Sequence, residues 1–553
     1  MLRKILSILT VVTLLSGAFV FAPAGVETAQ AAPSATITYN LYATDGYINL
    51  ADGRPLYIYG FVGGRSTDPL SYYDAGAAHP YDDPGVGGAH NPAPAPSGGI
   101  RTAAEEPLLG KAQLPGPAIY AATGDVVEIH LKNLGIQANT IAPNDPHSIH
   151  LHGLDVDAAN DGVPETSVGA VPANLCESGD SDVTPPYDCA EFGSVLAPGA
   201  GNVIVYMFTP DTPGTSMWHC HQEADIHVQM GMYGALVIYN PTDPAYLNGG
   251  PGKGFGGTYN GFKYDKDIIM LLSEVDVTFH EAEGGQYDAL YPAVTVTATN
   301  GTTATIPGTS KPIVWNPVDY HPQYWLINGL SFPDTIHANA GITFTEWIQA
   351  YPNYDPFIVG SVGTIARPAY SQWKTPGEKI LLRMINMGYE AQPMHIHGYH
   401  LKVLGNDQRP WPWANRVLWG KPTPFGQGLE KNTILIGSGE TYELLLDMGQ
   451  QALSSVYPAG TETRYDPGAN NDPRSNTATA YPGIPDAGDP APGVGTYITG
   501  PVVTGVMLPL QTGSVVNVST GGQVFPFHNH DDYKATNDGF YPGGQFTAVL
   551  AQP

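Results

Sequence analysis

The chain has 553 residues and a formal net charge of −28, with a sequence pI of about 4.7. Such an acidic surface repels nucleic acid and anionic membranes, and we expect neither as a partner. The same surface favours cations or neutral molecules. Glycine (66 residues) and proline (51) are abundant, short runs of valine, isoleucine, threonine and tyrosine recur, and long helical periodicity is absent. This pattern predicts an all-β protein built from sandwiches.

The start of the chain predicts export. Residues 1–31 begin with Arg3 and Lys4, continue with an apolar run and end in Ala-Gln-Ala. A basic start, an apolar centre and a small-residue cleavage site are typical of a secretory signal peptide, with an uncleaved anchor as the alternative. No later segment has the length of apolar sequence that a membrane helix needs. We therefore expect a soluble, secreted protein, extracellular or periplasmic.

The first half of the chain shows a run of short β-strands that ends in histidines. Residues 124–135 carry a turn glycine, an apolar β-run and an Asn-x-Gly ending, and His147, His150 and His152 follow. Alternate residues of a strand point to the same face, so the rings of His150 and His152 should share one side. The stretch 63–97, rich in proline and glycine, predicts a long surface insertion.

Three cysteines fit an exported protein. Cys176 and Cys189 lie close together in the sequence and could form a disulfide that closes an acidic loop. On the chain-entropy model, this disulfide would stabilise the folded protein by about 3 kcal/mol. Two free thiols are the alternative, which is less common outside the cell. The third cysteine, Cys220, lies in a different setting.

A cysteine between two histidines, at 219–221, is the most specific motif of the chain, and a histidine and a methionine follow it. A thiolate, two imidazoles and an axial thioether form the ligand set of a blue, type 1 copper site. The expected ligands of this site are His147, Cys220, His227 and Met232. The two histidines that flank the cysteine should point to the opposite face of the strand, toward a second metal site.

The second half repeats the layout of the first. Residues 377–388 match 124–135 in turn glycine, β-run and Asn-x-Gly ending, and a His-x-His-Gly follows in each case. The repeat predicts two homologous domains, at 35–240 and 265–553, joined by a Gly-rich linker at 241–264. The alternative is a third domain hidden within 265–370. Residues 452–500 predict a second long insertion.

The histidines of the second half lack the partners of a type 1 site. His395 and His397 form one His-x-His pair, and His528 and His530 form another. Gln392 stands where the equivalent of His147 would be, and Asn529 takes the place of the cysteine. We therefore expect imidazole ligands but no type 1 copper in this half. Across the whole chain, the four His-x-His pairs supply eight imidazoles: His150, His152, His219, His221, His395, His397, His528 and His530.

These motifs resemble those of the multicopper oxidase family, which carries His-x-x-His-x-His and His-Cys-His followed by histidine and methionine. The resemblance is to the two-domain, laccase-like type with its type 1 copper in the first domain. It implies tandem cupredoxin domains with one type 1, one type 2 and two type 3 coppers per chain. His150 and His395 would hold the type 2 copper, and the other six paired histidines the type 3 coppers.

The resemblance also implies a reaction and an assembly. One-electron oxidation of a phenol, another organic reductant or a metal ion at the type 1 copper would be coupled to reduction of O2 to water at the trinuclear cluster. Asp155 stands where such enzymes carry a carboxylate near the cluster, so it is a candidate proton relay, with a turn-capping role as the alternative. With two domains per chain, the six-domain ring that the family uses implies a homotrimer.

Other functions use some of these residues. A copper nitrite reductase shares the two-domain layout but needs only three histidines at its catalytic copper, which leaves the full set of eight unexplained. A copper carrier would need no electron-transfer copper next to a cluster. Among oxidase substrates, Glu223 and Asp225 near the type 1 site could bind Mn(II) or Fe(II), or could form a solvated loop face.

Overall fold

The computed structural model describes a large part of the chain. The described residues are 35–67, 70, 104–138, 145–164, 166–167, 169–170, 203–285, 294–297, 303–306, 317–336, 356, 358–361, 377–412, 414, 428–450 and 523–552. The predicted signal peptide, Cys176, Cys189, the insertion 452–500 and most of the insertion 63–97 lie outside them, so these interpretations stay predictions. None of the helices in the described ranges is long and apolar enough to cross a membrane.

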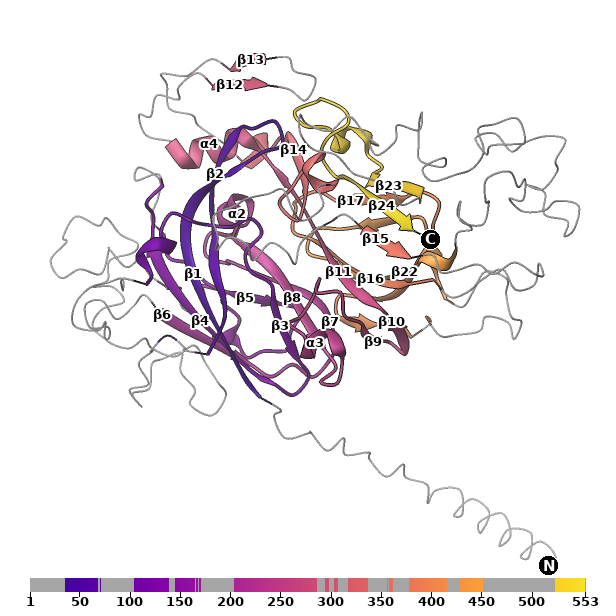
Figure 1. Cartoon of the computed structure of the whole chain (residues 1–553). Helices are drawn as coiled ribbons and strands as arrows, with labels where there is room; N and C mark the ends of the chain where they lie inside the picture. Colours follow the sequence, from indigo (N-terminus) through magenta and orange to yellow (C-terminus); the bar gives the residue numbers. More distant parts are fainter. Residues whose placement is uncertain are drawn as a thin grey trace, which may run out of the picture.

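The first half of the chain forms a β-sandwich of two four-stranded sheets (Figure 1). One sheet has the order β2 (Pro55–Ser66), β1 (Thr36–Asn49), β4 (Val126–Gly135) and β6 (Val203–Phe208). The other has the order β3 (Ile119–Ala122), β8 (Tyr233–Tyr239), β7 (Gly214–His219) and β5 (His150–His152). Helix α2 (Ala224–Met230) connects β7 to β8, and short 3-10 helices lie at Glu106–Leu108 and Ala158–Asn160.

The second half forms a larger sandwich of a seven-stranded and a five-stranded sheet. The seven-stranded sheet contains β14 (Tyr324–Ile327), β11 (Lys266–Val275), β16 (Lys379–Asn386), β22 (Thr441–Asp447), β18 (Leu401–Asn406), β19 (Arg409–Pro410) and β20 (Glu430–Lys431). The five-stranded sheet contains β15 (Ile358–Ser361), β24 (Phe546–Gln552), β23 (Gln523–Asn529), β17 (Gln392–Ile396) and β21 (Thr433–Ile436). Short 3-10 helices lie at Pro317–Asp319, Asp334–Ile336, Met448–Gln450 and Asp532–Ala535.

The two sandwiches repeat one topology. Strand β1 pairs in parallel with β4 as β11 does with β16, and β3 pairs in parallel with β8 as β15 does with β24. Even the strand ends agree, because Asn133 Oδ1 accepts from Gly135 N at 2.9 Å and Asn386 Oδ1 accepts from Gly388 N at 2.9 Å. The predicted all-β architecture of two repeated sandwiches is confirmed.

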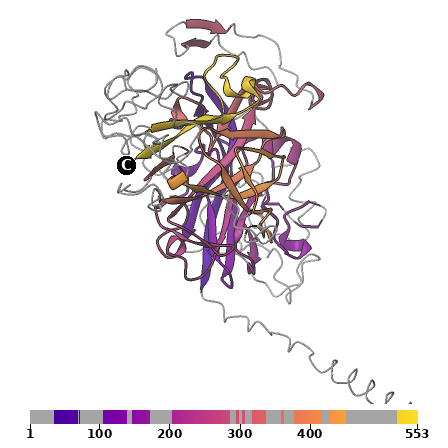
Figure 2. The ribbon, with the colours of Figure 1, turned by 90° about the vertical axis from the view of Figure 1, so that its right-hand side faces the viewer.

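The segment between the sandwiches is more ordered than a Gly-rich linker implies. It holds α3 (Pro244–Leu247) and a hairpin of β9 (Gly257–Tyr259) and β10 (Phe262–Tyr264). Helix α4 (Val277–Gly285) follows β11. Strands β12 (Val294–Thr297) and β13 (Thr303–Ile306) form a hairpin that stands clear of both sandwiches (Figure 1, Figure 2). The other described strands between 265 and 370 belong to the second sandwich.

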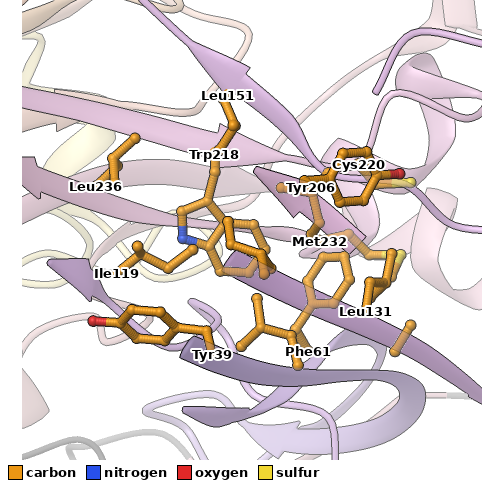
Figure 3. Packing of buried hydrophobic residues seen from close by; sticks show 14 of the residues in the cluster. Tyr39, Phe61, Ile119, Leu131, Leu151, Tyr206, Trp218, Cys220, Met232 and Leu236 are labelled. Atoms are coloured by element: carbon orange, nitrogen blue, oxygen red, sulfur yellow. The ribbon is translucent and has the colours of Figure 1, made fainter. Parts of the chain in front are cut away.

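The core of the first sandwich surrounds Trp218 on β7 (Figure 3). Phe61 packs against the indole with ring centroids 4.9 Å apart, and Leu236 and Ile119 belong to the same cluster. Cys220 lies at one end of this cluster and is fully buried. Since residues of a strand alternate between faces, burial of Trp218 in the core sends Cys220 to the same side and His219 to the other.

The opposite face of the β3-β8-β7-β5 sheet is buried against the second sandwich. Met217 and Val237 from this sheet share one apolar cluster with Ile269 and Leu271 of β11 and Ile385 of β16. Because this sheet is covered on both faces, each residue of β7 and β8 is buried. The two domains of one chain therefore form an extensive apolar interface.

A buried ion pair lies beside this interface. Arg383 of β16 donates from Nε to Asp267 at 2.8 Å and from Nη1 to Thr215 of β7 at 3.0 Å. Its guanidinium also lies 4.8 Å from the centre of the Tyr239 ring. Arg383 is 1% exposed and Asp267 is 1% exposed, so loss of either charge would leave the other without its partner in a poorly solvated site.

Arg383→Met is expected to lower the free energy of unfolding by about 3–5 kcal/mol, because it leaves the Asp267 carboxylate buried and unpaired. Urea titration followed by tryptophan fluorescence measures this loss. Arg409→Gln is the matched control: its exposed partner is Asp155 at 3.4 Å, and its loss should change stability by about 1 kcal/mol at most. Equal midpoints for the two variants would contradict the structural role of Arg383.

Candidate copper centres

The predicted type 1 ligands meet at the end of the first core. Cys220 Sγ lies 3.8 Å from His147 Nδ1 and 3.4 Å from His227 Nδ1. His227 comes from α2, whereas His147 precedes β5. Met232 is fully buried, and its carbonyl accepts from Cys220 N at 2.9 Å, so the thioether residue is adjacent to the cysteine (Figure 3). The chain thus brings together all four predicted ligands.

The environment of these groups suits a soft metal ion. Burial, and then the neighbouring His227, hold the pKa of His147 well below its usual range, which keeps this imidazole neutral. Burial also opposes the charged form of His227, but the charge of Cys220 and contact with Asp145 outweigh it and raise the pKa of His227 to about 10. A thiolate and two inward-facing Nδ1 atoms in a buried pocket fit copper, which would displace the proton of His227.

The four paired histidines of the first domain form one cluster, called here the first quartet: His150, His152, His219 and His221. His150 lies opposite His219 in the β5-β7 ladder. Ring centroids of His150 are 5.7 Å from His152, 5.0 Å from His219 and 5.2 Å from His221. Burial lowers the pKa of His219 to about 3, with a smaller contribution from the neighbouring histidines and against the opposing effect of its hydrogen bond to the Cys220 carbonyl, so this ring is neutral and able to bind a metal.

The second domain carries an equivalent cluster, the second quartet: His395, His397, His528 and His530. His395 lies opposite His528 in the β17-β23 ladder, as His150 lies opposite His219. His397 Nε2 and His528 Nε2 lie 3.0 Å apart. At this distance one ring donates a proton to the other, and a bound cation would take the place of that proton. The rings of His397 and His530 are exposed.

Hydrogen bonds orient the rings in both quartets in the same way. His150 Nδ1 bonds the Asp161 carbonyl at 2.7 Å, and His395 Nδ1 bonds the Asn432 carbonyl at 3.0 Å. His219 and His528 each bond, through Nδ1, the carbonyl of the following residue, at 2.9 and 2.8 Å. With Nδ1 as the donor, Nε2 of each ring presents its lone pair, as metal-binding histidines commonly do. The quartets therefore fit copper ligation through Nε2.

A pocket of about 290 Å3 adjoins the first quartet at the domain interface. His152 and His219 line it from the first domain, and Met387, Tyr389 and Gly439 line it from the second. Asp225, one of the two acidic residues predicted near the type 1 site, also lines this pocket. Among the described residues, no ring of the first quartet contacts a ring of the second.

The second domain places amides where the first has type 1 ligands. Gln392 and Asn529 are fully buried, and Asn529 Nδ2 donates to Gln392 Oε1 at 2.7 Å. Asn529 also donates to Gln545 Oε1 at 2.8 Å. Sequence reasoning identified the first two substitutions but not Gln545, because no motif marks its position.

The structure places two predicted acidic residues, Asp155 and Glu223, in different surroundings. Asp155, the candidate proton relay, has a side chain that is 83% exposed and pairs with Arg409 across the domain boundary, and no described contact joins it to a histidine. Glu223 Oε2 lies 3.9 Å from His227 Nε2. Asp145, which the sequence analysis missed, lies at 3.8 Å from the same atom. Its place two residues before His147 was the available signal.

Comparison with known proteins agrees with this geometry. The model of the multicopper oxidase family matches residues 101–242 and 366–452, which include every predicted ligand except His528 and His530. A protein of Oryza sativa subsp. japonica with the provisional name laccase-9 is 28% identical over 167 residues, which make up 30% of this chain and 21% of that protein. Laccase-2 of Cryptococcus neoformans var. grubii is 26% identical over 164 residues, 29% of this chain and 19% of that protein.

These matches span only about a fifth of the length of the two relatives. Among solved structures, the blue copper oxidase from Nitrosomonas europaea is 16% identical, covers 94% of this chain and 86% of its own, and has a TM-score of 0.43. A likeness at that score carries no argument about function. Two segments of the chain, which hold most of the predicted ligands, are thus similar to the multicopper oxidase family.

Proposed function

We propose that the protein is an exported, laccase-like oxidase that couples one-electron oxidation of phenols or other organic reductants to the reduction of O2 to water. One observation carries the proposal: the buried Cys220 Sγ faces two imidazole Nδ1 atoms, and the residues on either side of that cysteine belong to a histidine quartet. Copper held by the first ligand set would accept single electrons, and copper held by the quartets would supply the site where O2 takes up four electrons and four protons.

The chain's own residues account for the rest. Cys220 is bonded through the backbone to His219 and His221, so covalent bonds connect the two ligand sets. The pocket lined by His152 and His219 gives a small molecule access to the first quartet. Asp155 stays a candidate for proton delivery, although its exposed carboxylate would have to leave Arg409 to reach a histidine.

We further propose a homotrimer. The second quartet is open to solvent in one chain, with His397 and His530 exposed, and four histidines are only half of the ligand set for a trinuclear cluster. In a ring of three chains, the second quartet of one subunit would meet the first quartet of its neighbour. Each chain would then account for one type 1, one type 2 and two type 3 coppers.

Oxygen consumption by copper-loaded protein tests the activity. We expect phenols to drive oxygen uptake without release of peroxide. Consumption of nitrite in place of oxygen would favour a nitrite reductase, and a copper carrier would consume neither.

A second candidate activity, the oxidation of Mn(II) or Fe(II), is favoured by the carboxylates near His227. One carboxylate oxygen each from Asp145 and Glu223, with His227 Nε2, lie within 4.8 Å of one another. With Nδ1 on the type 1 copper, His227 Nε2 would keep its proton, so the carboxylates rather than this ring would hold the cation. Glu283 is a third carboxyl group that interacts with this site. Burial, and then the charge of Asp145, raise the pKa of Glu283 to about 7. A divalent cation would relieve this concentration of negative charge.

The double variant Asp145→Asn, Glu223→Gln should weaken Mn(II) binding to the reduced, anaerobic protein by about tenfold or more, since cation affinity follows ligand charge. Loss of the signal of free Mn(II) in electron paramagnetic resonance measures binding, because reduced copper is silent. Asp265→Asn, Glu378→Gln, a carboxylate pair of the second domain, is the matched control. Equal Mn(II) binding by the wild type, the double variant and the control would reject the cation site. If the protein still oxidised phenols, the main proposal would stand.

A further inference from the structure

The second domain keeps the frame of a type 1 site with other side chains in it. Because His395 pairs with His528 as His150 pairs with His219, Gln392 is the equivalent of His147 and Asn529 of Cys220. The third equivalence follows from the backbone. Asn529 N donates to the Gln545 carbonyl at 2.9 Å, as Cys220 N donates to the Met232 carbonyl at 2.9 Å. Gln392, Asn529 and Gln545, called here the amide triad, thus replace histidine, cysteine and methionine.

Every polar side-chain atom of the amide triad is hydrogen-bonded. Asn529 Nδ2 donates to both glutamines, and Asn529 Oδ1 accepts from Asp531 N at 2.9 Å. Gln545 Nε2 donates to the Ser273 and Leu326 carbonyls, each at 3.2 Å. All three side chains are fully buried. A buried network without unsatisfied atoms has one favoured arrangement, so it holds its backbone rigidly.

Glu274 of β11 anchors the amide triad to the domain interface. Its Oε2 accepts from Gln392 Nε2 at 2.8 Å, and its Oε1 accepts from Glu390 N at 3.0 Å and from the Tyr320 hydroxyl at 2.9 Å. Glu274 is 3% exposed. The carboxylate thus determines which way the Gln392 amide points, and Gln392 in turn presents its oxygen to Asn529.

This network acts on two expected copper ligands. His528 and His530 flank Asn529, and their rings point to the opposite face of the strand from the Asn529 side chain. In the first domain the corresponding strand end would be held by a metal-bound thiolate. We propose that the amide triad is a metal-free lock that positions His528 and His530 for copper, so that its members are positioning residues of the cluster. This inference rests on the proposed function.

Copper retention tests the lock. Protein dialysed against a graded series of a copper chelator is analysed for copper per chain, and the type 1 visible band serves as an internal reference in the first domain. Asn529→Ala should weaken copper binding at the cluster by roughly 10- to 100-fold, as loss of a residue that orients metal ligands commonly does. The type 1 band should persist, and disturbance of the type 3 pair that His528 and His530 would hold should leave an uncoupled copper, seen as a new signal in electron paramagnetic resonance.

Two further variants separate positioning from stability. Asn328→Gly also removes two buried hydrogen bonds from the second domain, at a residue whose φ of 53° glycine adopts readily, and it should retain the wild-type copper affinity. Gln545→Met installs the residue that the first domain has at this position and should also produce the signal of an uncoupled type 3 copper, even where Asn529→Ala does not fold. Wild-type copper affinity and a wild-type spectrum in the amide triad variants would overturn the proposal, as would equal copper loss in Asn328→Gly. A wild-type protein without cluster copper would instead reject the proposed function.

Discussion

Replacement of Cys220 by serine is expected to abolish the blue colour of the copper-loaded protein and to lower oxygen turnover by at least about 1,000-fold, which corresponds to about 4 kcal/mol of activation free energy. The physical reason is that a hydroxyl does not replace a soft thiolate as a copper ligand. The imidazoles of both quartets do not involve Sγ, so most of the cluster copper should remain bound.

This prediction is tested by measuring the visible absorption band, the copper content and the rate of oxygen uptake of the same sample. Met232→Leu is the control, because an axial thioether contributes less than the thiolate, and this variant should stay blue and active. A Cys220→Ser protein that retained either the visible band or wild-type turnover would show that the blue site lies elsewhere.

Loss of histidines from the second quartet should dissociate the assembly as well as stop oxygen reduction. His395→Ala and His528→Ala each remove a ligand that, in a trimer, would join copper held by the neighbouring chain. We expect loss of most cluster copper and a shift from trimer toward monomer in light scattering. The type 1 band should be retained, because its ligands all lie in the first domain.

His321→Ala is the control for this pair, since His321 lies in the same domain but outside the quartet, and it should leave mass and copper unchanged. An active wild-type monomer would contradict the trimer and would require both halves of the cluster to meet within one chain.

The repeat and the ligands were predictable because strand geometry is local. A His-x-His on a strand must place both rings on one face, and Cys220 must face away from His219. The regular structure around these residues follows the same rule, since Trp218 and Cys220 share the core while Met217 and His219 face the second domain. No long-range information was needed for these assignments.

Other parts of the site depend on tertiary contacts between distant segments. Gln545 accepts a side-chain hydrogen bond from Asn529 beyond the end of the β23-β24 ladder, and Glu274 reaches Gln392 from a strand more than one hundred residues away. The pocket beside His152 exists because Met387, Tyr389, Ser438 and Gly439 of the second domain line it opposite the first domain. Neither spacing nor composition marks such contacts, which explains why the amide triad and the role of Asp145 emerged only from the structure.

Copper counting combined with electron paramagnetic resonance tests the central claim most directly. Metal analysis of fully loaded protein should give four coppers per chain, and integration of the spectrum should give one type 1 and one type 2 signal in equal amounts, with the remaining two coppers silent as a coupled pair. Two coppers per chain together with nitrite turnover, or two type 1 signals per chain, would contradict the assignment of a trinuclear cluster shared by the two quartets.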